Sequence, residues 1–267
     1  MAENKSLEER KEGGRAGSVI ELTMPEVPFL VDEAINTLRG NIQLSGYDLK
    51  VICVTSAFKH EGKSSLSFRI AKSMAALNRR TVFLDCDNRN SQTVARYCDH
   101  VNQVGLSEYL CGDVRLEDVI CHTSQNDLDI IFTGAIAPNP SVLFSGDVFK
   151  SLIKTLRNTY DYVIVDTPPV NMVIDGVLIA KECDGTVLVV ESGVTDRAQA
   201  KHAKQQLEFA GVKLLGVVLN KAGSRRSGYG YGRYGYGYGY GRYGYGRYGY
   251  GRYGYGEYGY GEKKEEK

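Results

Sequence analysis

The apolar residues of this chain gather in short runs that alternate with stretches of mixed polarity. Six runs predict β-strands, at residues 51–55, 81–84, 128–132, 162–165, 186–190 and 214–219. Four stretches have the spacing of an amphipathic helix, at residues 32–44, 64–77, 151–159 and 197–209. Apolar strands that alternate with such helices predict an α/β fold of the P-loop type, in which helices cover both faces of a mostly parallel sheet.

The same pattern divides the chain into three parts. Residues 1–24 are charged and contain glycine, which predicts a flexible N-terminal segment. Residues 25–223 carry the strand and helix signals and predict one globular domain that can bury a sizeable core. Residues 224–267 contain no aliphatic side chain. They cannot bury enough apolar area to offset chain entropy, which predicts a disordered tail.

The tail holds fourteen of the nineteen tyrosines, separated almost entirely by glycine. Such a segment is by itself of low complexity or adhesive. It gains a chemical role if the same chain carries an enzyme that acts on phenolic hydroxyls. The candidate acceptors are Tyr229, Tyr231, Tyr234, Tyr236, Tyr238, Tyr240, Tyr243, Tyr245, Tyr248, Tyr250, Tyr253, Tyr255, Tyr258 and Tyr260.

Bulk composition excludes several classes of protein. The net charge is +1, which indicates neither a nucleic acid nor a membrane surface as partner. No early apolar run resembles a signal peptide, and no run approaches the roughly 18 residues of a membrane span. The six cysteines form no C-x-x-C pair, so they predict reduced core thiols instead of a disulfide or zinc framework.

A phosphate-binding loop is the first chemical motif. Residues 57–64 read A-F-K-H-E-G-K-S and lie between a predicted strand and a predicted helix. Gly62 would let the backbone approach a phosphate, Lys63 would reach the β- and γ-phosphates, and Ser64 would bind Mg²⁺. The strand and helix on either side argue against a chance G-K-S. Ala57 stands where the motif usually has a glycine. The candidate nucleotide contacts here are Ala57, Lys59, Glu61, Gly62, Lys63, Ser64 and Ser65.

Three aspartates follow predicted strands. Asp85 and Asp87 belong to the run L-D-C-D-N-R, and Asp166 belongs to V-D-T-P-P. Open parallel sheets bind ligands at the carboxyl ends of their strands, so we expect these carboxylates beside Lys63. They would supply Mg²⁺ ligands and a base for a hydroxyl nucleophile. Any one of them could instead be a helix cap or turn residue, but that explains poorly three around one phosphate loop.

These three motifs, followed by a tyrosine-rich tail, resemble the bacterial tyrosine kinases (BY-kinases), the cytoplasmic kinases of capsule and exopolysaccharide export systems. The resemblance runs from about residue 28 to the C-terminus and makes 25–223 the kinase domain. It includes Glu33, Asn36 and Arg39, which match the family's E-x2-R-x2-R oligomerisation motif except that Asn36 replaces the first arginine.

The resemblance implies a role for each matching residue. Lys63 and Ser64 bind ATP and Mg²⁺, and Asp166 holds Mg²⁺ through water. Asp85 and Asp87 divide metal binding and base duty, in an order that the sequence leaves open; Ser64, Asp87 and Asp166 are the metal candidates. Arg89 contacts phosphate unless it forms an exposed ion pair, and Asn220 lies at the adenine edge unless it is an ordinary turn residue.

The resemblance also implies an autokinase that phosphorylates its own tail between subunits and regulates polysaccharide synthesis or export. The implied partners are further copies in a ring, a membrane-spanning polysaccharide co-polymerase or adaptor as activator, and a phosphotyrosine phosphatase. The expected location is cytoplasmic, at the inner face of the membrane through that partner.

Two other interpretations compete with this one. A Min- or Par-type ATPase would carry K-G-G-x-G-K, but Phe58 stands where the signature lysine belongs and Lys59 is one place away. A nucleic-acid-binding protein could use arginines among aromatic residues. Only four arginines lie between Tyr229 and Tyr260, and glutamates close the tail, so we expect no nucleic-acid partner.

Overall fold

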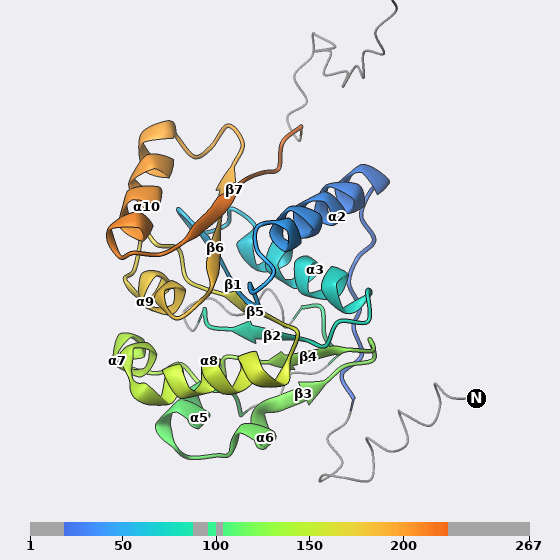
Figure 1. The fold of residues 1–267 in the computed structure, drawn as a ribbon, viewed down its shortest axis with the longest axis vertical. Coiled ribbons are helices and arrows are strands. Elements are labelled where there is room, and N and C mark those ends of the chain that lie inside the picture. Colours follow the sequence, from blue (N-terminus) through green and yellow to red (C-terminus); the bar gives the residue numbers. More distant parts are fainter. Residues whose placement is uncertain (1–18, 88–95, 100–103, 224–267) are drawn as a thin grey trace, which may run out of the picture. The chain divides into compact units, whose positions relative to one another are not determined.

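The computed structural model describes residues 19–87, 96–99 and 104–223. A seven-stranded sheet runs through this part of the chain in the order β3-β4-β2-β5-β1-β6-β7 (Figure 1). Neighbouring strands are parallel, except that β3 and β4 are antiparallel. The strands are β1 (Val51–Ser56), β2 (Thr81–Asp85), β3 (Ile120–His122), β4 (Leu128–Ile131), β5 (Tyr162–Asp166), β6 (Gly185–Glu191) and β7 (Leu214–Asn220).

Helices cover both faces of the sheet, because successive apolar side chains of a strand point to opposite faces. Ile52 and Val54 of β1 pack with α2 and α3, whereas Cys53 packs with α9 and α10 on the other face. The α8 helix covers that second face farther along the sheet. The helices are α2 (Phe29–Leu44), α3 (Lys63–Ala75), α5 (Leu106–Cys111), α6 (Leu116–Val119), α7 (Pro140–Ser145), α8 (Asp147–Thr159), α9 (Asp175–Lys181) and α10 (Arg197–Phe209).

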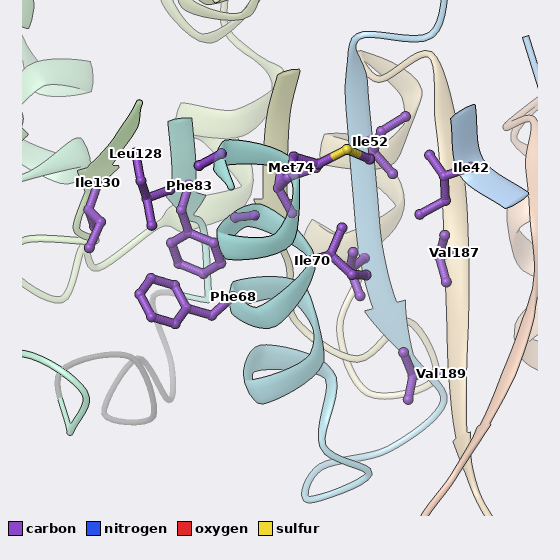
Figure 2. Close-up of a cluster of buried hydrophobic side chains, with 14 of the residues drawn as sticks. Ile42, Ile52, Phe68, Ile70, Met74, Phe83, Leu128, Ile130, Val187 and Val189 are labelled. Atoms are coloured by element: carbon purple, nitrogen blue, oxygen red, sulfur yellow. The ribbon is translucent and has the colours of Figure 1, made fainter. Parts of the chain in front are cut away.

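The α3 helix lies over the centre of the sheet and fixes the position of the phosphate loop. Its side chains Phe68, Ile70 and Met74 point into the core beside residues of the strands (Figure 2). The ring of Phe68 meets the ring of Phe83 edge to face, with 5.2 Å between their centroids. Burial of side chains of this size is worth roughly 1.5–3 kcal/mol each. The helix that begins at the site is therefore anchored along its length.

The predicted fold class is confirmed. Each of the six predicted strands forms, and their ends lie within one residue of the predicted ends. The helix predicted at 64–77 ends at Ala75, because Asn78 adopts a left-handed conformation with φ of 56°. The helix predicted at 151–159 begins earlier, at Asp147.

Short elements went unpredicted. The edge strand β3 has three residues, and the helices α5, α6, α7 and α9 have four to seven. Segments of that length span too few turns to show a periodic pattern.

The end of the predicted N-terminal segment packs on the domain. Ile20 is buried, and its backbone N–H donates to the carbonyl of His122 over 2.9 Å. Leu22 pairs with Cys98 in an isolated bridge. Within the described ranges no helix combines the length and apolar character needed to cross a membrane.

Candidate active site

The phosphate loop joins the carboxyl end of β1 to the first residue of α3, Lys63. Gly62 caps this helix with φ of 89°, a conformation that favours glycine. A Cβ atom at Gly62 would stand 2.2 Å from Nδ2 of Asn220, which donates to the carbonyl of Glu61 over 2.8 Å. The sequence thus places a glycine where the backbone and a neighbouring side chain both require it. The partial positive charge of the helix N-terminus faces the loop and favours an anion.

Three carboxylates gather around Lys63. Asp85 and Asp166 are register partners on the adjacent strands β2 and β5. The Lys63 ammonium lies 2.5 Å from Oδ2 of Asp87 and 3.6 Å from Oδ2 of Asp166. Asp85 accepts the backbone N–H of Asp87 over 3.1 Å. All four side chains are buried, so their charges act through a medium that screens them less than water does.

Burial is the largest influence on the pKa of three of these groups. Burial, followed by the charge of Asp166, raises the pKa of Asp85 to about 8. Burial also raises the pKa of Asp166, although the charge of Lys63 opposes it. Burial alone would lower the pKa of Lys63, but the charges of Asp166 and Asp87 outweigh it and raise that pKa. Without a bound cation, burial therefore keeps Asp85 protonated for most of the time at neutral pH, so Asp85 could serve as a base only when a cation is bound.

The residues present suit a hard divalent cation. Ser64 and the carboxylates of Asp87 and Asp166 offer oxygen atoms, which are the ligands that Mg²⁺ prefers. Burial and then the charge of Asp166 raise the pKa of Asp85, and a bound cation would oppose the second of these two effects. Among the residues that the structure describes, no three His, Cys, Asp or Glu side chains form a metal site by themselves. Mg²⁺ usually keeps several waters and shares substrate phosphates, so a complete protein cage is not required.

The other predicted loop contacts have different surroundings. Ala57 is buried and Lys59 is exposed. The carboxylate of Glu61 is buried and bonded to protein groups, with its Oε2 accepting the Phe58 N–H over 2.8 Å. The Ser65 hydroxyl lies 2.8 Å from the hydroxyl of Tyr97.

Sequence reasoning missed four residues of this site. Ser67 donates to Oδ1 of Asp166 over 3.2 Å, and its place one turn after Ser64 on the predicted helix was the available signal. Tyr97, Thr195 and Lys221 reach the loop from distant parts of the chain. No periodic or motif signal marks Tyr97 or Thr195, whereas Lys221 ends the stretch L-G-V-V-L-N-K, which is similar to the family's sequence but does not reveal the contact with the loop.

The predicted oligomerisation residues lie on α2 and are bonded within one chain. Arg39 donates to the Ser73 hydroxyl over 2.7 Å and to Oδ1 of Asn36 over 3.2 Å. Asn36 donates to Glu33 over 3.3 Å. Arg89 and the fourteen tail tyrosines lie outside the described residues.

Comparisons with known proteins identify the family of this chain. Residues 49–193 match the family model described as AAA domain. Tyrosine-protein kinase CpsD of Streptococcus agalactiae is 39% identical over 199 residues, which cover 74% of this chain and 87% of that protein. The kinase domain of Escherichia coli tyrosine kinase ETK has a TM-score of 0.69 and 30% identity, and the match covers 80% of this chain and 95% of that one.

Two further solved structures show how far the similarity extends. The chimerical protein CapA2B2 has a TM-score of 0.68 and 32% identity, with 79% of this chain and 97% of that chain covered. The septum site-determining protein MinD of Pyrococcus horikoshii has a TM-score of 0.56 and 21% identity, over 66% of this chain and 72% of that one, and shares the fold alone. The level of identity and its extent over both chains show that this chain belongs to the bacterial tyrosine kinase (BY-kinase) family.

Proposed function

We propose that this protein is an ATP- and Mg²⁺-dependent tyrosine autokinase whose main acceptors are the tyrosines of its own tail. The observation that carries the proposal is the buried Lys63 at the head of α3, within reach of Asp87 and Asp166. A phosphate loop alone would support any ATPase. Its combination with this carboxylate cluster, fourteen tyrosines in one chain and relatives named tyrosine kinases favours transfer to a tyrosine.

Each residue of the cluster has a distinct task in this reaction. Lys63 exchanges its carboxylate partner for the β- and γ-phosphates and neutralises their charge. Ser64, Asp87 and Asp166 are the residues that would hold Mg²⁺. When bound, Mg²⁺ neutralises charge on the phosphoryl group during transfer. Burial of the cluster excludes water and strengthens each of these interactions.

The proton of the acceptor goes to a carboxylate. Either Asp85 or Asp87 takes the proton of the tyrosine hydroxyl, and the phenolic oxygen forms a bond to the γ-phosphorus while the bond to the leaving ADP oxygen breaks. One of these two residues is the base, and the other lies beside the metal ion. An Asn variant at the base position loses turnover at every Mg²⁺ concentration, whereas an Asn variant at the metal position recovers part of it at high Mg²⁺.

We further propose that transfer occurs between subunits of a homo-oligomer and that it regulates capsular or exopolysaccharide synthesis. The pathway follows from the resemblance to the kinases of capsule and exopolysaccharide export systems, and relatives named tyrosine-protein kinase support the activity. The proposed activator is a membrane-spanning co-polymerase or adaptor that holds the kinase at the inner face of the membrane. A phosphotyrosine phosphatase would reverse the modification.

Incubation with ATP and Mg²⁺, followed by intact mass measurement and phosphotyrosine detection, tests the proposal. We expect a ladder of phosphate additions that disappears when residues 228–267 are deleted. Nucleotide binding should survive the deletion, since the described domain contains the whole loop. Strong labelling of the deleted protein would show that the tail is not the main acceptor.

A further inference from the structure

Glu61 is a buried carboxylate inside the phosphate loop, adjacent to Gly62. Only 2% of its surface is exposed. Its Oε2 accepts the backbone N–H of Phe58 over 2.8 Å, and its Oε1 accepts the hydroxyl of Thr195. One N–H group of the loop is therefore bonded to the protein's own anion.

Thr195 is oriented to serve this carboxylate. It lies between the end of β6 and the Asp196 cap of α10. The Thr195 oxygen accepts the backbone N–H of Glu191 over 3.1 Å, so its proton is directed to Glu61. The hydroxyl uses its donor and an acceptor position at once, as is expected of a partly buried polar group.

The negative charge of Glu61 explains why this carboxylate needs a hydrogen-bond donor such as Thr195. A phosphate-binding loop attracts anions, and a carboxylate of that loop repels the same anions where water is excluded. A buried carboxylate without hydrogen-bond donors is also costly in free energy. Both problems are reduced when fixed donors hold the charge and keep the side chain in one rotamer.

We propose that Thr195 is a positioning residue for nucleotide binding. Its hydroxyl holds Glu61 on the Phe58 N–H, which fixes the shape of the loop and keeps the negative charge from the phosphates. This inference rests on the nucleotide site of the proposed function. It adds that nucleotide affinity depends on the connection between β6 and α10, which no phosphate-loop motif contains.

Replacing Thr195 by Val removes the hydroxyl while keeping the shape of the side chain. We expect the dissociation constant for a fluorescent ATP analogue to rise about tenfold or more, as for loss of a hydrogen bond to a charged group. KM for ATP should rise more than kcat falls, and Thr195→Ser should restore binding. The matched control is Thr186→Val on β6, whose buried hydroxyl has no hydrogen-bond partner and whose loss should leave affinity unchanged.

The double variant Glu61→Ala/Thr195→Val decides the mechanism. With the carboxylate removed, the Thr195→Val change should weaken binding less than twofold relative to Glu61→Ala alone. An equal loss in both backgrounds, or wild-type affinity in Thr195→Val, overturns the inference. Should Thr195→Val alone fail to unfold cooperatively, the double variant should regain cooperative unfolding, and its failure to do so also overturns the inference.

The wild-type titration separates this inference from the proposed function. Wild-type protein that binds the analogue but labels no tyrosine would refute the kinase proposal and leave the role of Thr195 open to the same tests. Wild-type protein that binds no nucleotide would overturn both.

Discussion

Replacement of Gly62 by Ala tests the geometry of the phosphate loop in two separable steps. The first step is backbone strain, because a residue with a Cβ atom at φ of 89° pays roughly 1–2 kcal/mol. The second step is a collision, because the new Cβ atom would stand 2.2 Å from Nδ2 of Asn220. Asn220 must move and lose its bond to the Glu61 carbonyl, worth about 0.5–1.5 kcal/mol. We expect a total loss of about 2–3 kcal/mol in the free energy of unfolding.

Gly112 provides the matched control. It caps α5 with φ of 85° and ψ of 13°, close to the 89° and 17° of Gly62, and a Cβ atom there meets nothing within 4 Å. Gly112→Ala should therefore show the backbone cost alone. Urea unfolding of both variants, followed by nucleotide titration, measures the difference. Gly62→Ala should bind nucleotide more weakly, and Gly112→Ala should bind it normally.

A double variant isolates the collision. In an Asn220→Ala background the penalty of Gly62→Ala should fall to that of Gly112→Ala, which leaves a coupling energy of about 1 kcal/mol. Equal penalties for Gly62→Ala and Gly112→Ala in the otherwise unchanged protein would refute the reasoning, since Asn220 would then not hold the loop.

Three further predictions concern the carboxylate cluster and the tail. Folding raises the pKa of Asp85 from 3.8 to about 8. Between these two pH values, ionisation of Asp85 favours the unfolded chain, so it lowers the free energy of unfolding further as the pH rises. In metal-free buffer, Asp85→Asn should stabilise the protein by on the order of 2–4 kcal/mol more near pH 9 than near pH 5, and equal unfolding midpoints would contradict this. Asp166→Asn should keep the fold but lower the phosphorylation rate on the order of 10²-fold, and a normal rate with normal Mg²⁺ dependence would show its role to be misassigned. A Lys63→Met subunit mixed with an active subunit lacking residues 228–267 should become labelled on its tail, whereas an unlabelled tail would exclude transfer between subunits.

The strands and the aspartates that follow them could be predicted because both belong to regular patterns in the sequence. Strands that are buried on both faces read as unbroken apolar runs, and their carboxyl ends lie along one edge of a parallel sheet. That rule alone was enough to bring Asp85, Asp87 and Asp166 near Lys63. It could not assign the base, because the cost of burying each carboxylate depends on distances that a pattern does not contain.

The residues that hold the loop from outside were beyond prediction for a physical reason. Thr195 and Lys221 follow β6 and β7, about 130 and 160 residues from the loop along the chain. The Lys221 ammonium donates to the carbonyl of His60 over 2.7 Å and to Glu191 over 2.8 Å. These contacts exist only because the strand order places β6 next to β1 and β7 next to β6.

The same topology gives the last described residues of the domain a direct connection to the nucleotide site. Asn220 and Lys221 both bond to the phosphate loop, and residue 223 is the last one described before the tyrosine-rich tail. A bound nucleotide that shifts the carbonyls of His60 or Glu61 therefore acts on the end of β7, through Asn220 and Lys221. Since a ligand shifts an equilibrium only through differential contacts, the bonds of Asn220 and Lys221 to the loop are the contacts by which a bound nucleotide would affect the end of the described domain.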